Sequence, residues 1–145
     1  MNNNADRGVS WVFWIIGGFG LIWNLMGVMN FLWQMNISAD SLATLSEAQQ
    51  AIIEGRPLWV TVAFAVAVFA GVAGCVLLLL RKSMALALLF FSLLAVLVSM
   101  IPVFGMIGKV NFTTFERLMY LVATPALAAF LVWYTRRQIA HEKLN

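Results

Sequence analysis

Four long stretches without a charged residue constrain this chain more than any other feature of its sequence. They cover residues 11–34, 58–80, 84–104 and 118–135. A helix needs about 20 mostly apolar residues to cross roughly 30 Å of hydrocarbon. The stretches lack the alternation of polar and apolar residues that is typical of membrane-barrel strands. We therefore predict an all-α membrane protein, a four-transmembrane-helix bundle that forms a single integral membrane domain over residues 1–145.

The composition agrees with a bilayer as the principal partner of the chain. Hydrophobic residues make up 63% of the sequence and charged residues 10%, whereas soluble domains average about 45–50% and about 25%. A soluble enzyme, a disordered chain and a nucleic-acid-binding protein all need more charge than this. We expect no nucleic-acid partner. The first stretch exceeds the 7–15 apolar residues of a signal peptide, so we expect it to remain as a span.

The segments between the stretches carry helix-start signals. Ser46 and Gln49 form a capping-box pattern in the loop over residues 35–57, which predicts a short amphipathic helix over residues 47–54. Thr113 and Glu116 form a second capping box before the fourth span.

Prolines and a short turn define how the later helices are connected. Pro102 and Pro125 lie inside the third and fourth stretches, where each is expected to end or kink its helix. Arg81 and Lys82 form the short turn between the second and third stretches. So short a connection predicts that these two helices form an antiparallel hairpin.

Basic residues predict the orientation of the bundle. With four spans, both termini share one side with six basic residues, and three basic residues lie on the other side. The positive-inside rule then places both termini in the cytoplasm, in a multi-pass arrangement. The six are Arg7, Arg81, Lys82, Arg136, Arg137 and Lys143, and the three are Arg56, Lys109 and Arg117.

The uncharged interior excludes several kinds of chemistry. Ion-coupled transporters and proton pumps use Asp, Glu, His, Lys or Arg side chains within the membrane, and the four stretches contain none of these residues. The single His, His141, follows the last stretch, and the single Cys, Cys75, lies mid-span without a His or Asp to activate it. We therefore predict no enzymatic activity, no catalytic residues, no metal site and no cofactor.

Small and polar residues form a stripe along the first stretch, and this stripe allows two interpretations. Glycines let a neighbouring helix approach, and an Asn can hydrogen-bond across helices. Alternatively, the stripe is a solute site, where the Trp23 indole stacks on a sugar-like ring and the amides of Asn24 and Asn30 bind hydroxyl groups. Trp23 is the one Trp of six that lies far from both expected membrane interfaces. The stripe comprises Gly17, Gly20, Asn24, Gly27 and Asn30.

The second stretch carries a cleaner signal for close helix packing. Its small residues recur at small-xxx-small spacing on one helix face, which is typical of tightly packed membrane helices. This seam could pack against the first helix or against a second copy of the chain. It comprises Ala63, Ala67, Ala70, Gly71 and Gly74.

Three segments resemble a group of small bacterial four-span inner-membrane proteins of uncharacterised function. They read LIWNLMGVMNFLWQMN (residues 21–36), IIEGRPLWVTVAFAVAVFAGVAGCVLLLLRKS (residues 52–83) and LVWYTRR (residues 131–137). Some members of this group are labelled sugar transporters. The resemblance implies a bacterial inner membrane and four spans, and it carries over no catalytic or binding residues.

Two functions are compatible with the sequence. In the first, the protein binds or passes a small neutral, sugar-like solute without ion coupling, as a homo-oligomer, with Trp23, Asn24 and Asn30 at the site. In the second, it is a non-transporting accessory or scaffold subunit that grips a membrane partner protein through the seam within residues 63–74.

Overall fold

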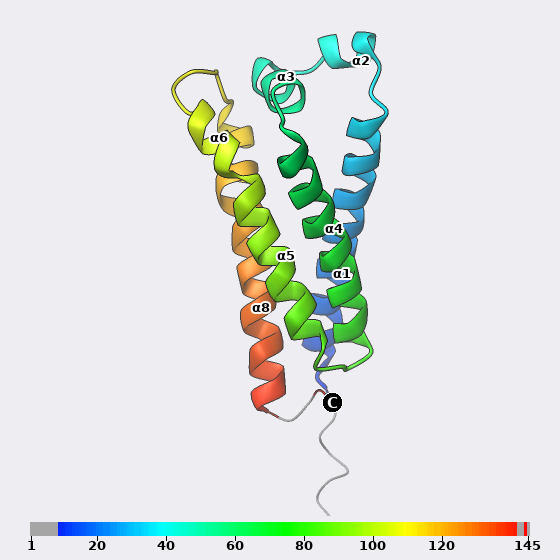
Figure 1. The fold of residues 1–145 in the computed structure, drawn as a ribbon. Coiled ribbons are helices and arrows are strands. Elements are labelled where there is room, and N and C mark those ends of the chain that lie inside the picture. The colour runs from blue at the N-terminus through cyan, green and yellow to red at the C-terminus, as the bar shows by residue number, and fades with distance from the viewer. Residues whose placement is uncertain (1–8, 142–143, 145) are drawn as a thin grey trace, which may run out of the picture.

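The computed structural model describes residues 9–141 and residue 144, and this part of the chain is helical without a β-strand (Figure 1). Its elements, in chain order, are α1 (Trp11–Met35), α2 (Ala39–Ala43), α3 (Glu47–Glu54), α4 (Leu58–Leu79), α5 (Ala85–Ser99), α6 (Ile101–Met106), α7 (Thr114–Arg117), a π-helical segment (Leu118–Ala123) and α8 (Thr124–Ala140).

Four helices are long and apolar enough to cross a membrane, which confirms the predicted four-helix bundle. These spans cover Trp11–Met35, Leu58–Leu79, Ala85–Met106 and Thr114–Ala140. Helix α4 packs against both α1 and α5, and α8 packs along α5. The hairpin between α4 and α5 is confirmed, and its tight turn places Arg81 at φ 60°.

The helix-start signals are also confirmed. The Ser46 side chain accepts a hydrogen bond from the Gln49 backbone N–H at the start of α3. Thr113 and Glu116 form the full capping box that starts α7. Helix α2 was not predicted, although Ser38 supplies an ordinary N-cap for it.

Both prolines interrupt their helices. Helix α5 ends at Ser99, and α6 begins with Pro102 in its first turn. Pro125 lies in the first turn of α8, directly after the π-helical segment. The Thr124 hydroxyl donates to the Met119 carbonyl oxygen at 2.9 Å, which satisfies a backbone acceptor beside the irregular turn.

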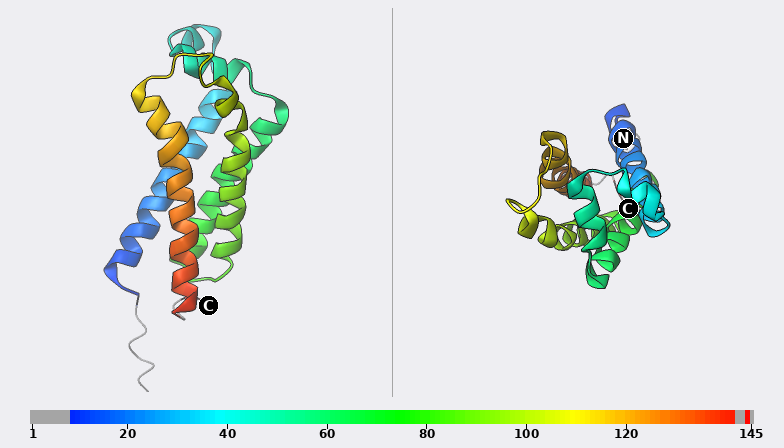
Figure 2. Two further views of the ribbon diagram at one scale, coloured as in Figure 1. Left: turned by 90° about the vertical axis from the view of Figure 1, so that its left-hand side faces the viewer. Right: turned by 90° about the horizontal axis from the view of Figure 1, so that it is seen from above.

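The bundle has two halves of different character. We call the end with the α4–α5 turn and residue 144 the terminal half, and the end with α2 and α3 the loop half. In the terminal half the helices converge, and Phe13 and Leu78 are fully buried beside Ala85 and Tyr134. Towards the loop half α5 and α8 lean away from α1 and α4 (Figure 1), and α3 lies across that end (Figures 1 and 2).

Candidate functional site

A cavity of about 460 Å³ lies in the loop half, between the diverging helices. This volume is within the 300–1,000 Å³ of typical small-molecule sites. Its walls are mainly aliphatic, aromatic and Met side chains, and its polar groups come from several helices. Those polar residues are Asn24, Asn30, Gln34, Gln49, Arg56, Ser92, Ser99, Tyr120 and Thr124.

Asn24 forms the floor of the cavity. Its amide nitrogen donates to the Gly20 carbonyl oxygen at 2.8 Å and to the Cys75 sulfur at 3.6 Å. Its amide oxygen rests against Gly71, where a Cβ atom would collide with it. Ser92 closes the floor from α5 by donating to the Ala67 carbonyl oxygen at 2.6 Å. Both amide hydrogens of Asn24 are therefore directed to partners within the protein.

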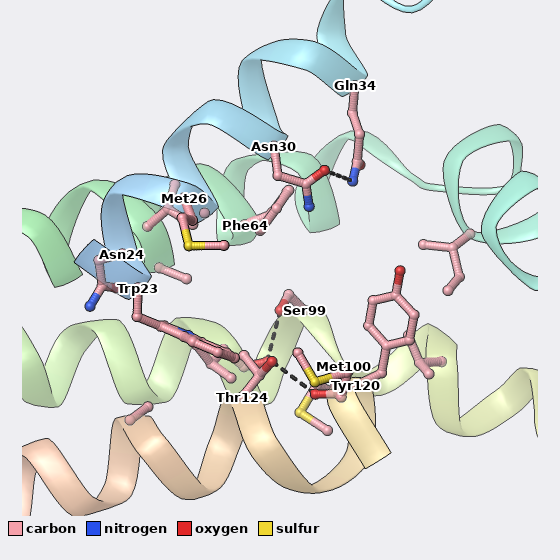
Figure 3. Close-up of a pocket in the computed structure, with 18 of the residues that line it drawn as sticks. Trp23, Asn24, Met26, Asn30, Gln34, Phe64, Ser99, Met100, Tyr120 and Thr124 are labelled. Atoms are coloured by element: carbon pink, nitrogen blue, oxygen red, sulfur yellow. Dashed lines mark hydrogen bonds between the residues drawn. The ribbon is translucent and has the colours of Figure 1, made fainter. Parts of the chain in front are cut away.

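Trp23 and Asn30 lie higher on α1 and line the cavity. Trp23 is the middle residue of α1, and its indole extends from α1 towards α8 and Thr124 (Figure 3). Asn30 and Gln34 point from α1 into the space that Ser99 and Tyr120 enter from the opposite wall (Figure 3). The cavity thus brings together all three residues of the predicted solute site, with Asn24 largely occupied by packing.

A chain of polar contacts forms the rim. The Gln34 amide nitrogen donates to the Asn30 side-chain oxygen at 3.2 Å, and Arg56 donates to the Gln34 side-chain oxygen at 2.8 Å. The Arg56 guanidinium carbon lies 5.7 Å from the centre of the Phe64 ring, which is a cation–π distance. Partial burial lowers the pKa of Arg56, yet a guanidinium remains charged at neutral pH.

Helix α3 covers the end of the cavity with its apolar face. Ile52 and Ile53 line the cavity from α3. The Ser46 hydroxyl at its N-terminus donates to the carboxylate of Glu116, whose other oxygen accepts from the Thr113 backbone N–H at 2.9 Å. Ser46 thereby ties the cover to the start of the fourth span.

The exposure of lining residues on α1 and α7 indicates that the cavity opens sideways, between these two helices. Met26 and Trp33 of α1 line it and are 61% and 46% exposed, and Phe115 of α7 lines it and is 71% exposed. These side chains border the space that lipid chains occupy around a membrane protein. A molecule dissolved in the bilayer could therefore reach the cavity without first crossing α3 or the packed terminal half.

The glycines of both predicted packing patterns lie against neighbouring helices. A Cβ at Gly17 would meet Leu79 at 2.5 Å, and one at Gly27 would meet Val68 at 2.9 Å. Gly20 faces Leu131 and Cys75, and Gly74 faces Leu89. Ala67 is buried, whereas Ala63 and Ala70 are half-buried. The glycines of both stripes thus serve contacts inside one chain.

Most of the cavity's polar residues were not predicted from the sequence as site residues. Gln34 and Arg56 are 22 positions apart in the sequence, and the folded loop over residues 36–57 brings them together. Tyr120 lies in the π-helical segment and Thr124 directly follows it, and both side chains line the cavity. One signal was available: Arg56 lies two residues before a span, where a long cationic side chain can reach along the helix end.

The described residues contain no group of three or more His, Cys, Asp or Glu side chains that could hold a metal ion. The polar groups of the cavity suit hydrogen bonding and, at Arg56, the binding of an anion. No protein-family model, curated protein or solved structure matches this chain. A proposal for the function of this protein therefore rests on the geometry of the cavity.

Proposed function

We propose that this protein binds a small molecule from the bilayer in its loop-half cavity. The observation that carries the proposal is the cavity itself: it has apolar walls, a polar rim and a side opening between α1 and α7. Such a lining suits a molecule with a hydrocarbon portion and one polar end. A sugar-like solute has polar groups all round, so the apolar walls favour it less.

The orientation predicted by the basic residues completes the proposal. With both termini in the cytoplasm of a bacterial cell, the loop half lies in the outer leaflet of the inner membrane. The packed terminal half then separates the cavity from the cytoplasm. Passage of the bound molecule would need a second conformation and would be uncoupled, because the stretches 11–34, 58–80, 84–104 and 118–135 carry no ionisable coupling residue.

The accessory-subunit alternative draws less support from the packing seam. Gly71 is buried between Asn24 of α1 and Ser92 of α5, and Gly74 packs on Leu89. A partner protein could not grip these two glycines without displacing helices of the same chain. Ala63 and Ala70 are half-buried and leave a smaller surface for such a contact.

The proposal is tested by filling the cavity. Ser99→Phe places a ring in the cavity, whereas Val98→Phe places the same ring on the exposed face of α5. The full chain is reconstituted in phosphatidylcholine nanodiscs and titrated with brominated hexadecanol, whose bromine atoms quench nearby Trp fluorescence. The signal from Trp23 is the difference between the parent protein and Trp23→Phe.

We expect saturable quenching of Trp23 that Ser99→Phe reduces at least about tenfold in affinity and Val98→Phe leaves unchanged. Equal quenching in both variants, or quenching that never saturates, would overturn the proposal. Glucose added as a competitor tests the sugar-like alternative, because displacement of the brominated chain by glucose would favour a sugar site. Circular-dichroism melting of each variant verifies that it is folded.

A further inference from the structure

Arg56 is the one charged side chain among the described residues that line the cavity. It is half-buried, and within the described part of the chain no carboxylate forms an ion pair with it. Its protein contacts are the Gln34 side-chain oxygen, at 2.8 Å, and the face of the Phe64 ring. The cavity therefore has a positive charge at its rim that no acidic side chain of the lining neutralises.

The guanidinium has donors left for a ligand. It carries five N–H donors in a planar fork that matches the oxygens of a carboxylate or a phosphate. Gln34 accepts one of these bonds, and Gln34 is itself held by Asn30. This arrangement fixes the guanidinium at the rim, so less freedom is lost when an anion binds.

The depth of Arg56 suits the head group of a membrane lipid. Arg56 and Gln34 lie at the loop-half ends of α4 and α1, beside the interfacial Trp33 and Trp59. Asn24 at the cavity floor is about 15 Å deeper along α1, at 1.5 Å per residue. This span equals about half of the hydrocarbon thickness of a bilayer.

We propose that the cavity takes a membrane amphiphile with an anionic head group, which binds Arg56 while its acyl chain lies along the apolar walls towards Trp23. This inference rests on the proposed function and specifies its ligand class. A free fatty acid and an anionic phospholipid share the required chemistry, which is an anionic oxygen group at the polar end of the molecule and an acyl chain. The side opening between α1 and α7 gives either of them access from the lipid phase.

The test compares two probes that differ in head-group charge. Brominated palmitic acid and brominated hexadecanol are titrated into nanodiscs that hold the full chain, at a pH where the fatty acid is ionised, and Trp23 quenching is measured. We expect the acid to bind the parent protein at least about tenfold more tightly than the alcohol. Arg56→Gln should abolish this preference, and Arg56→Lys should keep most of it.

Lys109→Gln is the matched control, because Lys109 is an exposed cation in the other loop at the same end and does not line the cavity. It should bind the acid like the parent protein. If Arg56→Gln does not fold, brominated palmitic acid bearing a methyl ester supplies the same loss of charge on the ligand side. Brominated phosphatidylglycerol is titrated in the same way, to distinguish a bilayer lipid from a free fatty acid as the ligand. Trp23 quenching that depends on Arg56, with either of these two probes, supports the proposal.

The possible failures can be told apart. Equal affinities of acid and alcohol in the parent protein, both lost in Ser99→Phe, would overturn the anionic ligand and leave the binding function intact. A preference for the acid that persists in Arg56→Gln would also overturn the role of Arg56. Absence of saturable Trp23 quenching by any of these probes would overturn both proposals.

Discussion

The two halves of the bundle are built from the same helices and differ in how far apart those helices lie. In the terminal half and at its border, Gly17, Gly20 and Gly74 let side chains of adjacent helices lie where a Cβ would be. In the loop half, bulky aromatic pairs stand between helices, such as Phe31 and Phe64 with ring centres 5.4 Å apart. The difference teaches that four helices can pack closely at one end of a bundle and enclose a cavity where two of them lean away from the other two.

The largest loss of stability is expected from a substitution at the border between the halves. Gly71→Leu would drive a side chain into Asn24 and Ser92, because a Cβ at Gly71 already collides with the Asn24 amide oxygen. We expect a loss of about 3 kcal/mol or more in the free energy of unfolding, measured by denaturation from mild detergent into sodium dodecyl sulfate. Ala73→Leu, on the exposed face of α4, is the control. Equal stability of the two variants would contradict the close approach of α1 and α4.

A matched pair of truncations compares the two halves directly. Leu78 is fully buried in the terminal half, and Leu127 lines the cavity. Leu78→Ala should cost about 2 kcal/mol, the low end of the range for buried Leu, because lipid chains replace some of the lost contacts in the unfolded state. Leu127→Ala should cost less than half as much, since its side chain already borders empty space. The same unfolding measurement compares the two variants. Equal losses in the free energy of unfolding would argue against a hollow loop half.

A smaller effect is expected at the cover of the cavity. Ser46→Ala removes both the N-cap of α3 and the hydrogen bond to Glu116. We expect a cost of about 1 kcal/mol, detected as faster backbone hydrogen exchange in α3 with unchanged exchange in the terminal half. Ser38→Ala is the control, because Ser38 caps α2 without a side-chain bond to another helix. An equal response of α3 to both variants would show that Glu116 does not hold the cover.

Much of the fold could be predicted because it depends on local signals. Hydropathy and length locate the spans, and the N-cap residues Ser46 and Thr113 fix where two helices begin. Pro102 and Pro125 act on the backbone of their own helices, so the interruptions at both were also predictable. These features need no knowledge of which helices are neighbours.

The cavity could be predicted only in part, because it depends on how far the helices diverge. The three residues predicted for a solute site, Trp23, Asn24 and Asn30, all line the cavity. The contacts of Asn24 with Gly71 and Cys75 could be predicted only by knowing that α4 lies beside that face of α1. The position of Arg56 over the cavity follows from the fold of a 22-residue connection, which no periodicity reveals.

The bond between Ser46 and Glu116 joins residues 70 positions apart, and this separation has a consequence for how the protein is made. During synthesis α1, α4 and α5 emerge first, and they can pair with one another as they enter the membrane. Glu116 follows only with the last span, so the bond that ties α3 to this span cannot form until the span is inserted. We expect the cavity to exist first as an open groove between three helices and to become enclosed in the final step of assembly.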